Sequence, residues 1–174
     1  MDEFEQELSE RLAAAQERAR TRGRNDVADY LLLRAANDAR RAESVAWLVE
    51  AFTALAGEAN RAGASVGLAR DEAHRFRVGN STMVGTRLVL SSGVRRVTLE
   101  AGWPRAPRDG IVRGGGLASA RVTHFGDARA GAEFLLVAPA DEESAPRWLV
   151  LGDDGARDPL SEEHLRRHLT KLLG

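Results

Sequence analysis

The chain has 174 residues, of which 43% are hydrophobic and 29% are charged, and its formal net charge at pH 7 is −1. That length suits one domain that buries a real core and carries one appended element. There is no cysteine, which excludes disulfides, zinc–thiolate sites and thiol nucleophiles. No apolar run approaches the roughly 20 residues that span a bilayer, and the N-terminal segment MDEFEQELSE is acidic, unlike a signal peptide. We therefore expect a cytoplasmic protein with no membrane partner.

The first predicted helix covers about residues 3–21. Asp2 is a suitable cap because its short side chain can accept a hydrogen bond from the free N–H groups of the first turn. Phe4, Leu8 and Leu12 then recur at helical spacing. Gly23 ends the predicted helix.

A second helix is predicted over residues 25–63, where an apolar stripe continues without a proline. This helix is either continuous or broken near Asn37 and Asp38. Its middle, RAANDARRAES, has only small or charged residues and cannot bury much surface by itself. Two arrangements fit this pattern: an antiparallel hairpin with the first helix, or a homodimer whose helices pack through alanines.

From residue 74 onward, apolar residues alternate with polar ones, which is typical of antiparallel strands with one wet face. Ser91, Ser92 and Gly93 predict a tight turn between two of these strands. Ser161 predicts the start of a final helix, whose buried stripe includes Leu165. The predicted strands are 74–78, 82–90, 94–100, 117–125, 133–138 and 147–151.

These elements predict an α+β fold. It consists of a long N-terminal helical hairpin or arm, a largely antiparallel sheet of about six strands, and a C-terminal helix packed on the sheet. The arm comprises residues 1–64 and is expected to mediate self-association, so we expect a homodimer. Residues 65–174 are expected to form the antiparallel domain.

Positive charge is concentrated in residues 74–125, which contain 9 Lys and Arg against 2 Asp and Glu. On one exposed face, these arginines would form a platform for a nucleic-acid backbone. That face would lack the interleaved aromatics of single-strand binders, because Phe76 lies on the opposite side of its strand. The same arginines could instead pair with the acidic flanking segments. The predicted basic face consists of Arg75, Arg77, Arg87, Arg95, Arg96 and Arg121.

Residues 102–116 are predicted to be a loop, because two prolines and five glycines disfavour helix and interior strand. An indole in a loop can stack on a ligand, arginines can bind phosphate or carboxylate, and consecutive glycines let backbone N–H groups approach an anion. The alternative is that the tryptophan packs into the core and the arginines are solvated. The glycines match neither a phosphate loop nor a dinucleotide fingerprint. The candidate binding residues are Trp103, Arg105, Arg108, Arg113, Gly114, Gly115 and Gly116.

Catalytic signals are sparse. His74, His124 and Asp109 are the only acid/base set worth naming. His164 and His168 have the helical spacing of metal ligands, but no third ligand is indicated, so we predict neither a metal nor a cofactor.

The sequence therefore predicts a non-enzymatic interaction module. It would self-associate through its N-terminal helices and contact a protein partner or a small anionic ligand through loop 102–116. A nucleic-acid-binding protein that uses the arginines of residues 74–125 is one alternative. An enzyme that uses the two histidines and the aspartate is the other.

Overall fold

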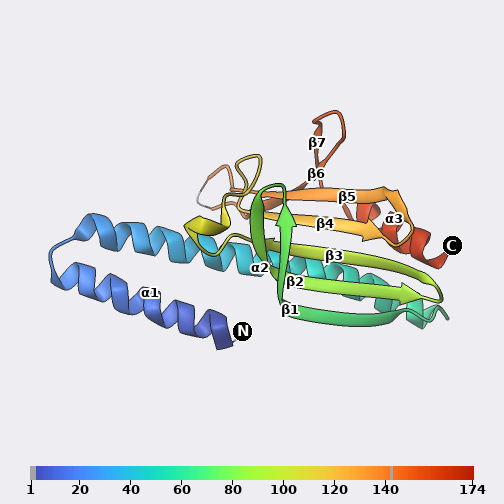
Figure 1. The fold of residues 1–174 in the computed structure, drawn as a ribbon, viewed down its shortest axis with the longest axis horizontal. Coiled ribbons are helices and arrows are strands. Elements are labelled where there is room, and N and C mark those ends of the chain that lie inside the picture. The colour runs from blue at the N-terminus through green and yellow to red at the C-terminus, as the bar shows by residue number, and fades with distance from the viewer. Residues whose placement is uncertain (1–2, 142) are drawn as a thin grey trace. The chain divides into compact units, whose positions relative to one another are not determined.

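The computed structural model describes residues 3–141 and 143–174 (Figure 1). They divide into two compact units, residues 1–42 and 43–174. Helix α1 (Glu3–Thr21) matches the predicted helix, and a turn at Gly23, whose φ is 71°, leads to α2 (Asn25–Arg61). Helix α2 is continuous, which settles the question left open by its sequence. The proposed cap Asp2 and the side chain of Phe4 lie outside the described part of the chain.

The first unit buries very little apolar surface of its own. Among residues 6–42, only Ala19 and Ala28 are buried. Tyr30 and Leu33 of α2 are 62% and 60% exposed. Because residues 6–42 of the two helices bury no large side chain, packing within this unit contributes little stability.

The second unit contains a seven-stranded antiparallel sheet in which every strand lies beside its neighbour in sequence. This confirms the predicted α+β class and the antiparallel sheet, with one strand more than expected. The extra strand, β7, has three exposed residues, too few to produce a periodic pattern. The strands are β1 (Gly67–Val78), β2 (Ser81–Ser92), β3 (Arg95–Trp103), β4 (Ala118–His124), β5 (Asp127–Val137), β6 (Arg147–Leu151) and β7 (Arg157–Pro159).

Two strands extend beyond their predicted ends. Strand β1 begins at Gly67, within a segment whose glycines favoured a connection, because edge pairing with β2 supplies the backbone hydrogen bonds. Strand β3 continues through Gly102 and Trp103, which the sequence placed in the loop. Gly102 pairs with Gly85, and Trp103 pairs with Val84.

One face of the sheet is covered by the second half of α2 and by α3 (Glu162–Leu173), as Figure 1 shows. Phe52 of α2 is fully buried, and the indole N–H of Trp148 donates a hydrogen bond to the Ser44 carbonyl of α2 (3.1 Å). Leu165 and Leu169 of α3 are also buried. The predicted packing of the C-terminal helix on the sheet is therefore confirmed.

The other face carries no helix among the described residues, and we call it the open face. The last part of β1 crosses over it (Figure 1), after an irregularity in the pairing with β2 between Asp71 and His74. Near this crossing, β2 and β3 approach very closely at Gly85 and Gly102. A Cβ on Gly102 would lie 2.5 Å from the carbonyl oxygen of Val84. The crossing segment buries Phe76 against the sheet, and the Arg77 carbonyl accepts a hydrogen bond from Arg121 of β4 (3.0 Å).

Candidate functional site

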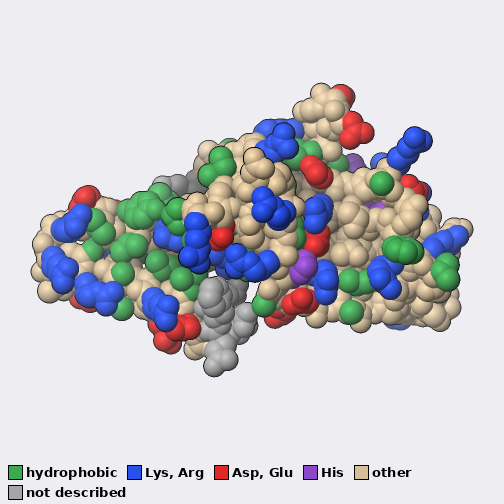
Figure 2. All heavy atoms as spheres, viewed as in Figure 1, with side chains coloured by type: hydrophobic (Ala, Val, Ile, Leu, Met, Phe, Trp, Pro, Cys, Tyr) green, Lys and Arg blue, Asp and Glu red, His purple; other side chains and the backbone are tan. Residues whose placement is uncertain are grey.

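Charged side chains of alternating sign form a row across the open face. In register, Arg87 of β2 lies opposite Glu100 of β3, Glu100 opposite Arg121 of β4, and Arg121 opposite Glu133 of β5. Such cross-strand pairs of opposite charge stabilise a sheet. Figure 2 shows Lys and Arg interspersed with Asp and Glu on this face. Arg87 and Arg121 therefore have carboxylates within the sheet as neighbours.

Glu100 is the centre of this row. Its carboxylate accepts hydrogen bonds from Arg121 Nε (2.5 Å) and pairs with His74 Nε2 (2.6 Å). Burial by itself would raise the pKa of Glu100, but the bonds from Arg121 and His74 lower it below its usual value. The imidazole of His74 stacks on Phe76, with ring centroids 6.0 Å apart. These contacts give His74 and Arg121 a structural role in holding β1 over the sheet.

A hollow of about 840 Å³ lies on the open face beside this row. It is bordered by the β1–β2 turn, by the loop before β4 and by the β6–β7 hairpin. Four arginines and two carboxylates line it: Arg77, Arg113, Arg121, Arg157, Glu133 and Asp153. We call this hollow the basic hollow.

Three of these arginines make no ion pair with the described residues. Arg113 and Arg157 are exposed, and Arg77 makes only a 3.4 Å contact with the Asn80 carbonyl. The guanidinium of Arg157 lies against Gly114, and that of Arg113 lies against Gly79. Arg113 and Arg157 come from different elements and line the same hollow without an ion-pair partner among the described residues, which favours a bound anion.

The glycine run of the predicted loop serves close packing. Gly116 lies so close to Leu135 and to the Leu136 carbonyl of β5 that no side chain fits there. Gly114 and Gly115 have φ values of 83° and 76°, a region that disfavours other residues. The run therefore presses the loop onto β5 and places Arg113 at the rim of the basic hollow.

Trp103 does not offer its ring to a ligand. It is 2% exposed, because it is the last residue of β3 and points to the covered face. The guanidinium of Arg105 lies 3.5 Å from the centroid of the Trp103 ring and donates hydrogen bonds to the Val84 carbonyl. This is the alternative in which the indole packs into the core, so Trp103 and Arg105 are not part of the basic hollow.

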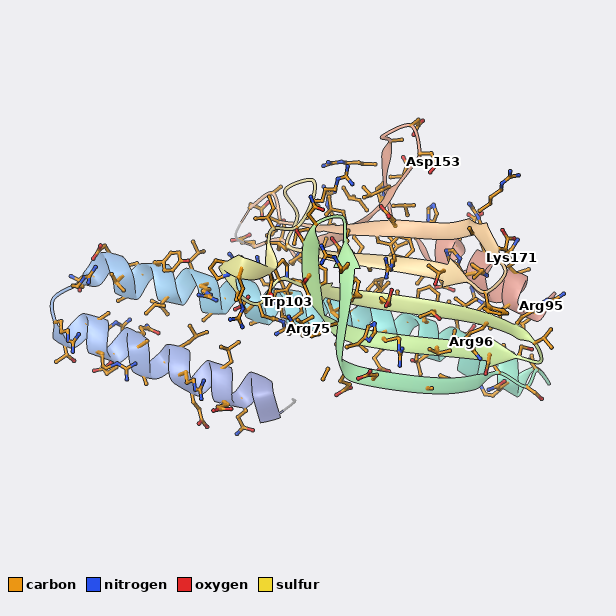
Figure 3. All side chains as sticks on the ribbon, in the orientation of Figure 1. Arg75, Arg95, Arg96, Trp103, Asp153 and Lys171 are labelled. Carbon is orange, nitrogen blue, oxygen red and sulfur yellow. The ribbon has the colours of Figure 1, made fainter. Side chains whose placement is uncertain are left out.

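The other predicted arginines are dispersed. Arg75 pairs with the buried Asp109 at 3.4 Å, and Arg87 lies 3.8 Å from Asp71. Arg108 is exposed in the short helix Pro107–Asp109. Arg95 and Arg96 lie at the opposite end of the sheet from Arg75 and Trp103 (Figure 3). The predicted basic face is therefore only partly assembled, since Arg77 and Arg121 alone line the hollow.

The two candidate catalytic histidines, His74 and His124, are not brought together. His74 lies on the open face with Glu100, whereas His124 points to the covered face. Asp109 accepts a hydrogen bond from the Ala106 N–H in the short helix. The separation of the two histidines leaves no position that all three groups could share around a reacting group.

His124 instead forms a buried pair with His168 of α3. Its Nε2 lies 2.9 Å from His168 Nδ1. Burial and the neighbouring Lys171 ammonium lower the pKa of His124. Burial, followed by the charge of His124, lowers the pKa of His168 from 6.5 to about 4. Both rings are therefore neutral near pH 7, with one donating and the other accepting the shared hydrogen bond.

Arg157 and Asp153 were missed by the sequence analysis. Both belong to the β6–β7 hairpin, in a segment rich in Gly and Asp that carries no strand periodicity. Only the pairing of β7 with β6 brings Arg157 to the same hollow as Arg113. No local pattern indicates that relation.

Two features are absent from residues 3–141 and 143–174. No group of three His, Cys, Asp or Glu could hold a metal ion. None of the helices there is both long and apolar enough to cross a bilayer.

Comparison of the chain with protein-family models, curated proteins and solved structures gave no match. The fold and the site define the class of protein by themselves. It is an α+β protein with a seven-stranded antiparallel meander, helices on one face, and a hollow with arginines at its rim on the other.

Proposed function

We propose that the protein is a non-enzymatic interaction module that binds an anionic ligand, or an acidic segment of a partner protein, in the basic hollow. The observation that carries this proposal is the convergence of Arg77, Arg113 and Arg157 without carboxylate partners among the described residues. Guanidinium groups that line one open hollow repel each other, and a bound carboxylate or phosphate relieves this repulsion.

The chemistry of the lining favours an extended, mostly acidic ligand. Arg121 is already bonded to Glu100, so it contributes less to a new anion than Arg77, Arg113 and Arg157, which have no carboxylate partner among the described residues. Glu133 and Asp153 on the lining would repel a ligand of uniformly high negative charge. An acidic peptide that also carries polar or basic side chains would pair with the arginines and would avoid repulsion by Glu133 and Asp153.

The test replaces the two rim arginines, Arg113→Gln with Arg157→Gln. Binding is measured by fluorescence anisotropy with a labelled peptide of about ten residues alternating Glu and Ser, and by NMR titration with inorganic phosphate. We expect a loss of affinity of about tenfold or more per arginine, because a hydrogen bond to a charged group is worth roughly 1.5–3 kcal/mol.

The matched control is Arg95→Gln with Arg96→Gln, which removes the same charge at the other end of the sheet. It should retain the affinity of the parent protein. Equal losses in the two double variants would mean that the peptide responds to net charge alone, and the proposed site would be wrong.

We propose in addition that the N-terminal helices mediate self-association. The support is that residues 6–42 bury only alanines, while Tyr30 and Leu33 remain mostly exposed. Packing against a second copy would bury these side chains and stabilise the helices. Closed two-fold dimers are the commonest way in which identical chains achieve this.

Analytical ultracentrifugation tests the self-association. Tyr30→Glu with Leu33→Glu is expected to convert a dimer into a monomer, since each charge would be buried in the proposed interface. The control is Leu68→Glu with Ile111→Glu, which replaces two exposed apolar residues of the second unit. A parent protein that sediments as a monomer at all concentrations would contradict this part of the proposal.

The two alternatives have less support. A nucleic-acid surface would need the arginines of residues 74–125 together, and Arg75, Arg87 and Arg121 have carboxylate partners. Steep weakening of oligonucleotide binding with added salt would favour it. An enzyme that uses His74, His124 and Asp109 would need groups that lie apart in the fold.

A further inference from the structure

Exposed apolar side chains and cations gather at the end of the sheet opposite Trp103. The β2–β3 turn presents Val94, which is 92% exposed, and the β4–β5 turn presents Phe125, which is 76% exposed. The two turns are neighbours, because the Phe125 N–H donates a hydrogen bond to the Arg96 carbonyl (2.9 Å). We call this end, with Val94, Arg95, Arg96 and Phe125, the turn tip.

Cations flank these apolar side chains. The guanidinium of Arg96 lies 6.0 Å from the centroid of the Phe125 ring, within the range of a cation–π contact. Arg95 reaches the end of α3 near Gly174, and Lys171 of that helix lies at the same end of the sheet (Figure 3). The charges of the turn tip are therefore adjacent to its protruding apolar groups.

The nearby acidic group does not cancel this charge. Asp127 follows Phe125 in the same turn, but Lys171 Nζ lies 2.6 Å from its carboxylate. The hydrogen bond from Lys171 lowers the pKa of Asp127, so this pair is internally neutral. Arg95 and Arg96 make no ion pair with an Asp or Glu among the described residues. The Arg95 guanidinium lies at Gly174, where the negative end of α3 offsets part of its charge, so the excess of positive charge at the turn tip comes mainly from Arg96.

We propose that the turn tip docks on an anionic lipid surface, with Val94 and Phe125 inserted at the boundary between headgroups and acyl chains and with Arg95 and Arg96 at the lipid phosphates. Two single side chains that project from convex turns offer no flat apolar patch for a protein interface. A lipid interface deforms around them and needs no complementary pocket. The expectation of no membrane partner rested on the lack of a spanning segment, which surface docking does not require.

Co-sedimentation with vesicles tests this proposal. The full chain is mixed with vesicles of phosphatidylcholine, or of phosphatidylcholine with about 30% phosphatidylserine, because anionic lipid attracts basic side chains. We expect binding to the second kind only. Arg95→Gln with Arg96→Gln should weaken it about fivefold per arginine, since one basic residue near such a surface is worth about 1 kcal/mol. Val94→Ser with Phe125→Ser should weaken it at least tenfold through the loss of apolar insertion.

Matched controls separate this surface from the basic hollow. Arg113→Gln with Arg157→Gln removes the same charge, and Ile111→Ser replaces an equally exposed apolar residue elsewhere. Both should leave vesicle binding unchanged. The proposal is overturned if the parent protein does not bind the anionic vesicles, or if the control variants lose as much vesicle binding as the turn-tip variants. It is also overturned if the turn-tip substitutions leave vesicle binding unchanged and alter only the oligomer mass in vesicle-free solution, which would indicate that the turn tip contacts a second copy. Because the first control is the variant expected to weaken peptide binding in the hollow, failure of either proposal is visible separately.

Discussion

Gly102→Ala is expected to destabilise the fold by about 3 kcal/mol or more, the upper end of the range for overpacked sites. A Cβ at this position would lie 2.5 Å from the Val84 carbonyl oxygen and 2.9 Å from the Gly85 nitrogen. Both atoms belong to the backbone of the neighbouring strand, so a side chain cannot rotate away to make room. Strands β2 and β3 would have to separate and lose hydrogen bonds near the place where β1 turns over the open face.

Urea unfolding followed by circular dichroism measures this loss. The control is Gly57→Ala in α2, where the added Cβ meets only the Arg61 guanidinium at 3.5 Å. There the same substitution should stabilise the protein by about 0.5–1 kcal/mol, because glycine is unfavourable inside a helix. A Gly102→Ala protein as stable as its parent would show that the close approach of β2 and β3 is not required.

Acidification from pH 7.5 to 5 is expected to remove on the order of 2 kcal/mol of stability through the buried histidine pair. The pKa of His168 is about 4 in the folded protein and 6.5 without the fold. Since the folded pKa is the lower one, the unfolded chain takes up more protons as the pH falls below 6.5. The contribution of neutral His168 to the free energy of unfolding is therefore complete above pH 6.5 and is lost progressively as the pH falls toward 4.

Urea midpoints across this pH range provide the measurement. His168→Leu should reduce the loss between pH 7.5 and 5 by at least half, whatever its effect at pH 7.5. His164→Gln on the same helix leaves the hydrogen-bonded rings of His124 and His168 in place. This variant should therefore still lose most of the stability that the parent protein loses between pH 7.5 and 5. If the His168→Leu variant and the parent protein lose the same amount of stability between pH 7.5 and 5, the histidine pair is not the source of the acid sensitivity. Carboxylates with lowered pKa, such as Glu100, contribute mainly at lower pH.

For the segment around Trp103, the sequence predicts the loop but not the orientation of the indole. Prolines and glycines on its C-terminal side disfavour regular structure, and this holds for most of residues 104–117. Nothing local, however, shows that β3 continues through Gly102 to pair with β2. The orientation of the indole follows from that pairing, which is a relation between residues about 20 positions apart in the chain.

Arg113 and Arg157 illustrate the same limit for the basic hollow. Arg113 was identified from the sequence because it stands beside a glycine run in a basic segment. Arg157 was not, because its segment is acidic and has no strand pattern. The sheet register and the position of the last hairpin put both arginines at one hollow.

The sequence by itself determined the α+β class, the two N-terminal helices, the antiparallel strands and the C-terminal helix, because these follow from capping residues and from periods of 3.6 and 2. The tertiary structure decided which arginines remain uncompensated and which apolar side chains remain exposed. A cross-strand neighbour, such as Glu100 beside Arg121, is set by register. Register depends on packing across the whole sheet, so it is not encoded near either residue.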